Sequence, residues 1–188
     1  MARQAVAAAK AVSLDPNDPF NRASNAVGLA AMRRFDDATA EAESALVSSP
    51  NDADVLGAVA ITLARVGRHE QALEVVNRQI RLDPFLAPGQ VGNTIGGAMY
   101  QLGRYREAAE AATYCTQRAP TNTNCHSNLV AALGQMRSAA TAAAVAELLR
   151  VSPGFTVSAE RSRRVTTYRN EADVDRVADG LRKAGVPE

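Results

Sequence analysis

Five prolines recur through most of the chain at a nearly constant spacing. Pro16, Pro50 and Pro84 lie 34 residues apart, Pro120 follows after 36 residues and Pro153 after 33. They stand in similar phrases, such as "SLDPND", "VSSPND" and "RAPTN". Because proline lacks an N–H and clashes with the preceding helical turn, each of these positions is expected to end a helix. A period of this length predicts an array of similar units, each of which buries its apolar face against its neighbours.

Other residue types keep the same register. Alanine stands twelve residues before three of the prolines, glycine seventeen before two, and a ring side chain fifteen before three. These residues are Ala38, Ala72 and Ala108; Gly67 and Gly103; and Phe35, His69 and Tyr105. Small side chains let two helices approach closely, and glycine suits a left-handed turn between them. The pattern therefore predicts two helices per period.

The registered copies resemble the tetratricopeptide repeat (TPR), a helix–turn–helix unit of 34 residues. The resemblance covers residues 1–155 and implies an all-α superhelical solenoid of antiparallel helix pairs with C-terminal capping helices. It also implies a non-catalytic module for protein–protein interaction. The composition agrees, because hydrophobic residues make up 46% of the chain and aromatic residues only 4%. Strands favour β-branched and aromatic residues instead.

The register divides the chain into a half repeat, four full repeats and a tail. The half repeat is 1–18, the repeats are 19–52, 53–86, 87–122 and 123–155, and the tail is 156–188. Two extra residues fall near Ala87 and Pro88. The fourth repeat is the least regular, because Thr141 replaces the expected alanine and the turn in "GQMRS" is expected to be short.

Residues 2–14 are predicted to form the second helix of a repeat whose first helix is missing. We expect from this half unit that the chain is a piece of a longer protein, cut inside its repeat array. A single capping helix is the alternative. A third interpretation is self-association, in which helix 2–14 buries its uncovered face against another copy in a homodimer.

The tail is predicted to contain two helices. In "NEADVDRVADGLRKAG", Asn170 is a plausible N-cap, and Val174, Val177 and Leu181 share one helical face. We expect the tail to cap the open end of the last repeat. The alternative is that it docks into the array's own groove and competes with a ligand.

The end of the chain carries a second resemblance. The run "SPGFT" and the terminal "LRKAGVPE" are similar to the closing segment of bacterial proteins in which a TPR array follows a class III adenylate/guanylate cyclase domain. This resemblance implies that the chain is the C-terminal part of a multidomain signalling protein, with an upstream domain of the same polypeptide as its partner. No metal-binding or nucleotide-binding residue of the cyclase can be placed on the chain. A stand-alone adaptor that binds a peptide or a partner protein is the alternative.

Composition and motifs argue against several other functions. A net charge of +1 does not favour nucleic acid, and no apolar run approaches the roughly 20 residues of a membrane span. His69 and His126, the two histidines, fall in different repeats, and His69, which shares the repeat position of Phe35 and Tyr105, is expected to be structural. "GQVGNTIGG" lacks the Gly-Lys-Ser/Thr ending of a phosphate loop. We therefore predict no enzymatic activity, no cofactor, no metal, no nucleic-acid partner and no membrane insertion.

The two cysteines bear on location. Cys115 and Cys125 fall on consecutive predicted helices and are expected to be two buried thiols. That expectation accords with a cytoplasmic location. A periplasmic location would apply if the parent protein carries an upstream membrane span, and a disulfide would point to such a compartment.

In TPR proteins the ligand groove comes mainly from exposed positions of each first helix. The matching residues in the first two repeats are Phe20, Ala23, Ser24, Val27, Asp54, Gly57, Ala58, Ile61 and Arg65. Those in the third and fourth repeats are Gln90, Asn93, Thr94, Gly97, Tyr100, Gln101, Asn124, Ser127, Asn128 and Gln135.

This set lacks lysine, so it does not match the carboxylate clamp of some TPR proteins. Asn93, Asn124 and Asn128 are candidates to hydrogen-bond a peptide backbone, with Tyr100 as an apolar anchor. A plain solvated surface is the alternative interpretation.

Overall fold

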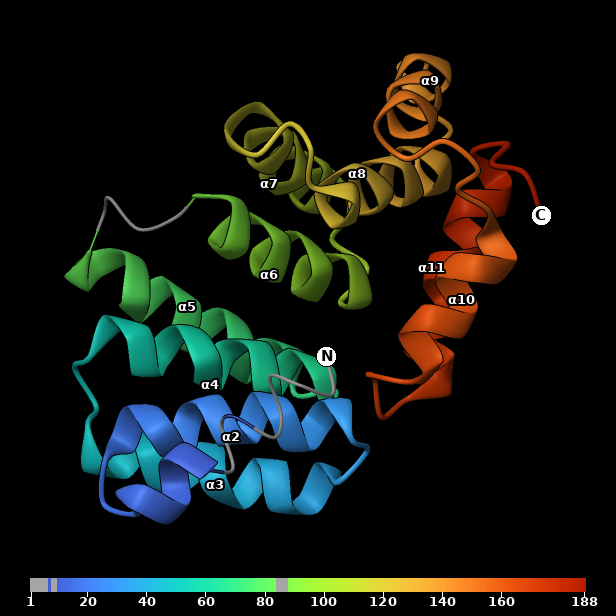
Figure 1. Cartoon of the computed structure of the whole chain (residues 1–188). Coiled ribbons are helices and arrows are strands. Elements are labelled where there is room, and N and C mark those ends of the chain that lie inside the picture. The colour runs from blue at the N-terminus through green and yellow to red at the C-terminus, as the bar shows by residue number, and fades with distance from the viewer. Residues whose placement is uncertain (1–6, 8–9, 84–87) are drawn as a thin grey trace. The chain divides into compact units, whose positions relative to one another are not determined.

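The computed structural model describes residue 7 and residues 10–83 and 88–188, with only the main chain for residues 88–91 (Figure 1). The regular structure of these residues is helical, so the predicted all-α fold of antiparallel helix pairs is confirmed. Most of the predicted helix 2–14 lies outside the described residues, but residues 10–14 are helical. The chain divides into two compact units.

Unit 1 comprises Met1–Leu86 and Thr166–Asn170. Its helices are α2 (Pro19–Ala31), α3 (Phe35–Ser48), α4 (Ala53–Arg65) and α5 (His69–Leu82). Helix α2 packs against α3, α4 packs against α5, and α4 also contacts α2 and α3. Ala38, Ala42 and Ala45 are completely buried on α3, which confirms that small residues line the contact between paired helices.

Unit 2 comprises Ala87–Val165 and Glu171–Glu188. Its helices are α6 (Pro88–Gln101), α7 (Tyr105–Arg118), α8 (Thr123–Gln135), α9 (Thr141–Val151), α10 (Val157–Val165) and α11 (Glu171–Lys183). The pairs α6–α7 and α8–α9 repeat the arrangement of unit 1, and α11 packs against α8 and α10. One core joins Tyr100, Val130, Leu148, Val157 and Leu181. The tail helices thus share the core of the third and fourth repeats.

The phrases that contain the prolines also start the next helix. Asp18, Asp52 and Asn122 are N-caps, and their side-chain oxygens accept the N–H groups of Phe20 at 2.7 Å, Asp54 at 2.9 Å and Asn124 at 3.0 Å. Such bonds satisfy N–H groups that have no partner within the helix. One short phrase therefore ends one helix and begins another.

Left-handed residues mark the turns inside the helix pairs. Gly67 and Gly103 have φ values of 86° and 75°, as predicted, and Arg33 and Arg137 adopt 62° and 50° in the other two pairs. The expectation of a short fourth turn is wrong. Helix α9 begins only at Thr141, so residues 136–140 separate it from α8, because Ser138 and Thr141 bond to nearby backbone groups instead of extending the helix.

Gly103 offers a clean test of this turn geometry. A Cβ atom added there would meet no atom within 4 Å, so only the left-handed backbone opposes a side chain. We expect Gly103→Ala to lower the free energy of unfolding by about 1 kcal/mol, measured by urea denaturation. Gly103→Asn should cost less, because asparagine tolerates this conformation better. Equal stability of Gly103→Ala and the wild type would contradict a left-handed backbone at Gly103.

Candidate protein-interaction surface

The predicted groove residues of unit 1 lie on α2 and α4. Phe20 is 49% exposed and Asp54 is also exposed, whereas Ser24, Val27, Ala58, Ile61 and Arg65 are half-buried. A guanidinium N–H of Arg65 donates to the carbonyl oxygen of Val27 at 3.0 Å and links the two helices. This surface combines an aromatic ring, aliphatic side chains and charged groups.

Two of the predicted positions are interior and do not belong to this surface. Ala23 is completely buried. Gly57 is buried against α5, where an added Cβ atom would lie 2.4 Å from Nε2 of Gln79. The glycine leaves room for the Gln79 amide, which donates to the carbonyl oxygen of Ala53 at 2.9 Å. The assignment of Ala23 and Gly57 to an exposed groove is therefore wrong, because helix packing uses both.

In unit 2 most of the predicted residues are covered by the chain itself. Thr94, Tyr100, Gln101, Ser127 and Asn128 are buried, whereas Asn93, Gly97, Asn124 and Gln135 are half-buried. The side chain of Gln90 lies outside the described residues. Helices α10 and α11 account for this burial, since they bond to most of the residues concerned.

Helix α11 is hydrogen-bonded to α6 through its main chain. The hydroxyl of Tyr100 donates to the carbonyl oxygen of Arg176 at 2.7 Å, and Nε2 of Gln101 donates to that of Asp173 at 3.0 Å. A guanidinium N–H of Arg176 donates in return to the Gln101 carbonyl oxygen. Burial raises the pKa of the Tyr100 phenol to about 12, so this hydroxyl remains a donor at neutral pH. Two predicted side chains thus recognise the backbone of a helix.

Helix α11 also touches α8 along a glycine contact. A Cβ atom added to Gly180 would lie 2.3 Å from the Tyr100 hydroxyl and 2.7 Å from the Ala131 carbonyl oxygen. One added to Gly134 would lie 2.2 Å from the Gly180 carbonyl oxygen. The two helices therefore approach backbone to backbone, which is the close approach that glycine permits.

A polar group closes the end of this contact. Nε2 of Gln135 donates to a carboxylate oxygen of Asp179 at 2.9 Å, and Lys183 donates to the Gln135 side-chain oxygen at 2.9 Å. The hydrogen bond from Lys183, followed by that from Gln135, lowers the pKa of the Asp179 carboxyl. Predicted residues at both ends of the surface therefore contact α11.

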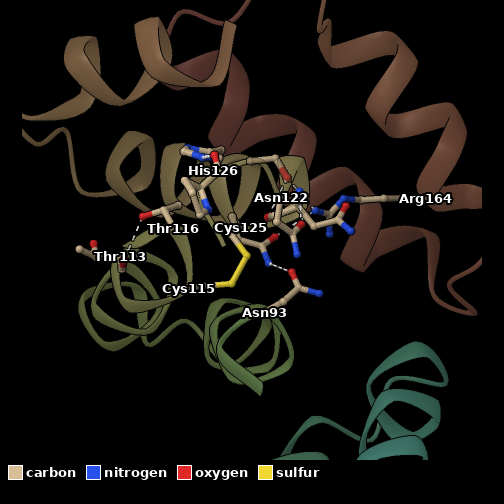
Figure 2. The surroundings of a disulfide bond; sticks show 12 residues. Asn93, Thr113, Cys115, Thr116, Asn122, Cys125, His126 and Arg164 are labelled. Atoms are coloured by element: carbon tan, nitrogen blue, oxygen red, sulfur yellow. Dashed lines mark hydrogen bonds between the residues drawn. A yellow bond between two sulfur atoms is a disulfide. The ribbon is translucent and has the colours of Figure 1, made fainter. Parts of the chain in front are cut away.

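Helix α10 brings a buried ion pair to the same surface. Glu160 and Arg164 are 4% and 5% exposed, and Nε of Arg164 lies 2.6 Å from Oε1 of Glu160. Arg164 reaches α8 (Figure 2), where it donates to the Asn128 side-chain oxygen at 2.9 Å and to Oγ of Ser127 at 3.3 Å. Asn128 donates in turn to Oδ1 of Asn93 at 3.0 Å.

Arg163 extends this network towards the solvent. It pairs with Glu160 at 2.8 Å and donates to Oδ1 of Asn124 at 2.8 Å. The three predicted asparagines, Asn93, Asn124 and Asn128, therefore all take part in one polar network with α10. Glu160 and Arg164 were not among the predicted residues. Their four-residue spacing on a helix was the available signal, because such residues face one another.

A disulfide joins Cys115 of α7 to Cys125 of α8 (Figure 2). The expectation of two thiols is therefore wrong. The Cα atoms lie 5.7 Å apart, a separation that a disulfide spans readily. Gly92 of α6 makes room for the bond, since a Cβ atom added there would lie 2.9 Å from Cβ of Cys115. The bond fixes the third repeat to the fourth beside the predicted surface.

Removal of this bond should destabilise unit 2. The closed loop is short, with a sequence separation of 10 residues, so we expect reduction, or the double change of Cys115 and Cys125 to alanine, to lower the free energy of unfolding by about 2 kcal/mol. Denaturant unfolding with and without reductant measures the effect. An unchanged midpoint would show that the two sulfur atoms are not bonded in solution.

Both histidines occupy packed positions, as predicted for His69. His69 is 7% exposed, and His126 is 4% exposed with Nε2 2.8 Å from the Pro120 carbonyl oxygen. Within residues 10–83 and 88–188, no group of three or more His, Cys, Asp or Glu side chains could hold a metal ion. Among the helices described, none combines the length and the apolarity required to cross a bilayer.

Solved structures with similar folds are TPR proteins. TTC0263 of Thermus thermophilus, a thermophilic TPR protein, is 19% identical with a TM-score of 0.64, over 87% of this chain and 88% of that one. YrrB, described as a TPR protein with an unusual peptide-binding site, is 16% identical with a TM-score of 0.60. The match covers 96% of this chain and 91% of YrrB. PilF of Pseudomonas aeruginosa is 20% identical with a TM-score of 0.62, and the match covers 91% of this chain and 78% of PilF.

No protein-family model matches the sequence, and a search of curated proteins gives no match either. At identities of 16–20%, the likeness to the solved structures establishes the fold.

Proposed function

We propose that this chain is a non-catalytic TPR module that binds a protein or peptide partner. The observation that carries the proposal is the contact between Tyr100 and Gln101 and the main-chain carbonyls of α11. An amphipathic helix laid in a groove is a common mode of peptide recognition. The predicted surface of repeats three and four already has this chemistry, with α11 as the helix.

A partner helix that uses this surface must compete with α11. The attached helix has an advantage, because its linkage gives it a high effective concentration, of the order of millimolar for short flexible linkers. Binding of a partner would therefore depend on release of the tail, which makes the module regulatory. Unit 1 provides a second surface, around Phe20, Val27 and Ile61, which is partly exposed.

A labelled peptide that spans residues 171–184 tests the proposal. We expect weak binding to the wild-type chain and binding at least about 10-fold tighter to the Gly180→Ala chain, whose own α11 fits poorly. A peptide with leucine in place of Gly180 is the matched control and should not bind. Circular dichroism establishes that the variant chain retains its helices. Equal, undetectable binding of both peptides to a folded variant chain would contradict the proposal.

The disulfide supports an oxidising compartment as the place of action. Disulfides persist in the periplasm and outside cells and are rare in the cytosol. We therefore propose an extracytoplasmic location in place of the cytoplasmic one that the sequence favours. Alkylation of an extract of the source cells under non-reducing conditions, followed by mass spectrometry, should find Cys115 and Cys125 linked. If both cysteines are alkylated instead, they are free thiols, and a cytoplasmic location would be favoured.

The terminal phrase "LRKAGVPE" supports a finer proposal, that the chain is the regulatory tail of a multidomain bacterial signalling protein of adenylate/guanylate cyclase type. An immunoblot of the source cells tests it. A band far larger than 19.8 kDa would support a multidomain parent, and a band at that mass would favour the stand-alone adaptor. Self-association through helix 2–14 remains a separate prediction, for which sedimentation should show a dimer.

A further inference from the structure

A second candidate site lies within unit 1. It is a cavity of about 370 Å³ between α2, α3 and the helical residues 10–14. This volume is within the range of small-ligand sites. Its apolar lining residues are Val12, Leu29, Met32 and Ala40. The polar and charged ones are Asn25, Asp37 and Glu41, which have oxygen acceptors, and the cations Arg22 and Arg34.

Among them, Asn25 and Glu41 each carry a buried oxygen atom without a hydrogen-bond partner. These atoms are Oδ1 of Asn25, which is 8% exposed, and Oε2 of Glu41. A buried acceptor without a donor is costly and rare in folded proteins. Two such acceptors that line the same cavity indicate a ligand that supplies the donors.

The cations near the cavity already have partners. Arg22 donates to the Pro16 carbonyl oxygen at 2.7 Å and to Oγ of Ser44 at 2.8 Å. Arg34 pairs with Asp37 at 2.8 Å. The guanidinium groups of the lining therefore donate to groups other than Glu41, and Oε2 of Glu41 has no hydrogen-bond partner. A positively charged donor complements this arrangement better than a neutral or an anionic group.

We propose that this cavity binds an organic cation that carries an ammonium or guanidinium group on a short aliphatic stem. The charged head lies between Asn25 and Glu41, and the stem packs on Leu29, Met32 and Val12. A lysine or arginine side chain of another protein and a free alkylamine share this chemistry. The site does not depend on the groove of repeats three and four.

Methyl NMR of the full chain tests the proposal with n-butylammonium as the probe. We expect saturable shifts at the methyl groups of Leu29 and Met32, and none with butyrate, which has a similar stem and the opposite charge. Glu41→Gln should weaken binding at least about 10-fold, since it removes a charge-assisted hydrogen bond. Glu74→Gln, a change at an exposed position of α5, should leave binding unchanged.

The same spectra separate the two sources of the cation. A lysine-containing helical peptide that binds much more tightly than butylammonium would assign the head group to a protein partner. Comparable affinities would assign it to a free amine. Equal response to butylammonium and butyrate, absence of saturable shifts, or unchanged binding in a Glu41→Gln variant whose spectrum is that of a folded chain would overturn the proposal.

Discussion

Replacement of Glu160 by glutamine should lower the free energy of unfolding of unit 2 by about 3–5 kcal/mol. Glu160 and Arg164 are both almost completely buried, and the change removes the carboxylate that pairs with the Arg164 guanidinium at 2.6 Å. Denaturant unfolding at neutral pH measures the loss. Glu171→Gln, at an exposed position of α11, is the matched control and should change little.

A double variant tests whether the loss of stability comes from the unbalanced charge of Arg164. Replacing Glu160 and Arg164 together by methionine removes both charges and keeps apolar volume, so most of the lost stability should return. If the single and double variants were equally unstable, the ion pair would not be the cause of the loss.

Protonation of Glu160 at low pH should reproduce part of the stability loss expected for Glu160→Gln. Burial by itself would raise the pKa of Glu160, but the charges of Arg164 and Arg163 and their hydrogen bonds outweigh it and set the pKa below its ordinary value. A carboxyl with a lowered folded-state pKa stabilises the fold above its unfolded pKa, about 4.3, and loses this contribution as the pH falls through the folded value. The wild type should therefore lose stability below about pH 4.3 more steeply than Glu160→Gln. Parallel curves would contradict this.

Replacement of Gly180 by alanine should lower the stability of unit 2 by about 3 kcal/mol, at the upper end of overpacking effects. The new methyl group would meet the Tyr100 hydroxyl and the Ala131 carbonyl oxygen, so α11 must move away from α8. The expected sign is the reverse of the usual one, because alanine normally stabilises a helix by about 0.5–1 kcal/mol relative to glycine.

Gly97→Ala provides the control for this reversal. Gly97 also lies in a helix of unit 2, but a Cβ atom there would meet only the Asn128 side chain at an ordinary 3.8 Å. This variant should be neutral or slightly more stable. A Gly180→Ala protein that also gained stability would show that α11 does not pack closely on α8 in solution.

The repeat register predicted the helices well, because its signals are local. Proline, the capping Asp and Asn residues, and the turn glycines act within a few residues of their own positions. The regularly spaced alanines likewise indicate where helices adjacent in the sequence pack together. The fourth turn was the exception, where Ser138 and Thr141 compete for backbone hydrogen bonds and delay the start of α9.

The docking of the tail could not be predicted in the same way. Sequence patterns show that Val174, Val177 and Leu181 form an apolar face, but not which surface covers it. That surface depends on a close backbone contact at Gly180 and on Glu160 and Arg164, which meet Ser127 and Asn128 more than 30 residues away. Contacts of such long range leave no periodic signal. The disulfide is a similar case, since its formation depends on the space that Gly92 leaves on another helix.

Hydrogen exchange on the wild-type chain, with and without the peptide of residues 171–184, tests the central claim most directly. If the surface of α6 and α8 is a helix-binding groove, the amides of α11 should exchange faster when peptide is added, while those of α6 and α8 stay protected. If α6, α8 and α11 exchange together and the peptide has no effect, α11 is a permanent part of the core and the groove is not a binding site.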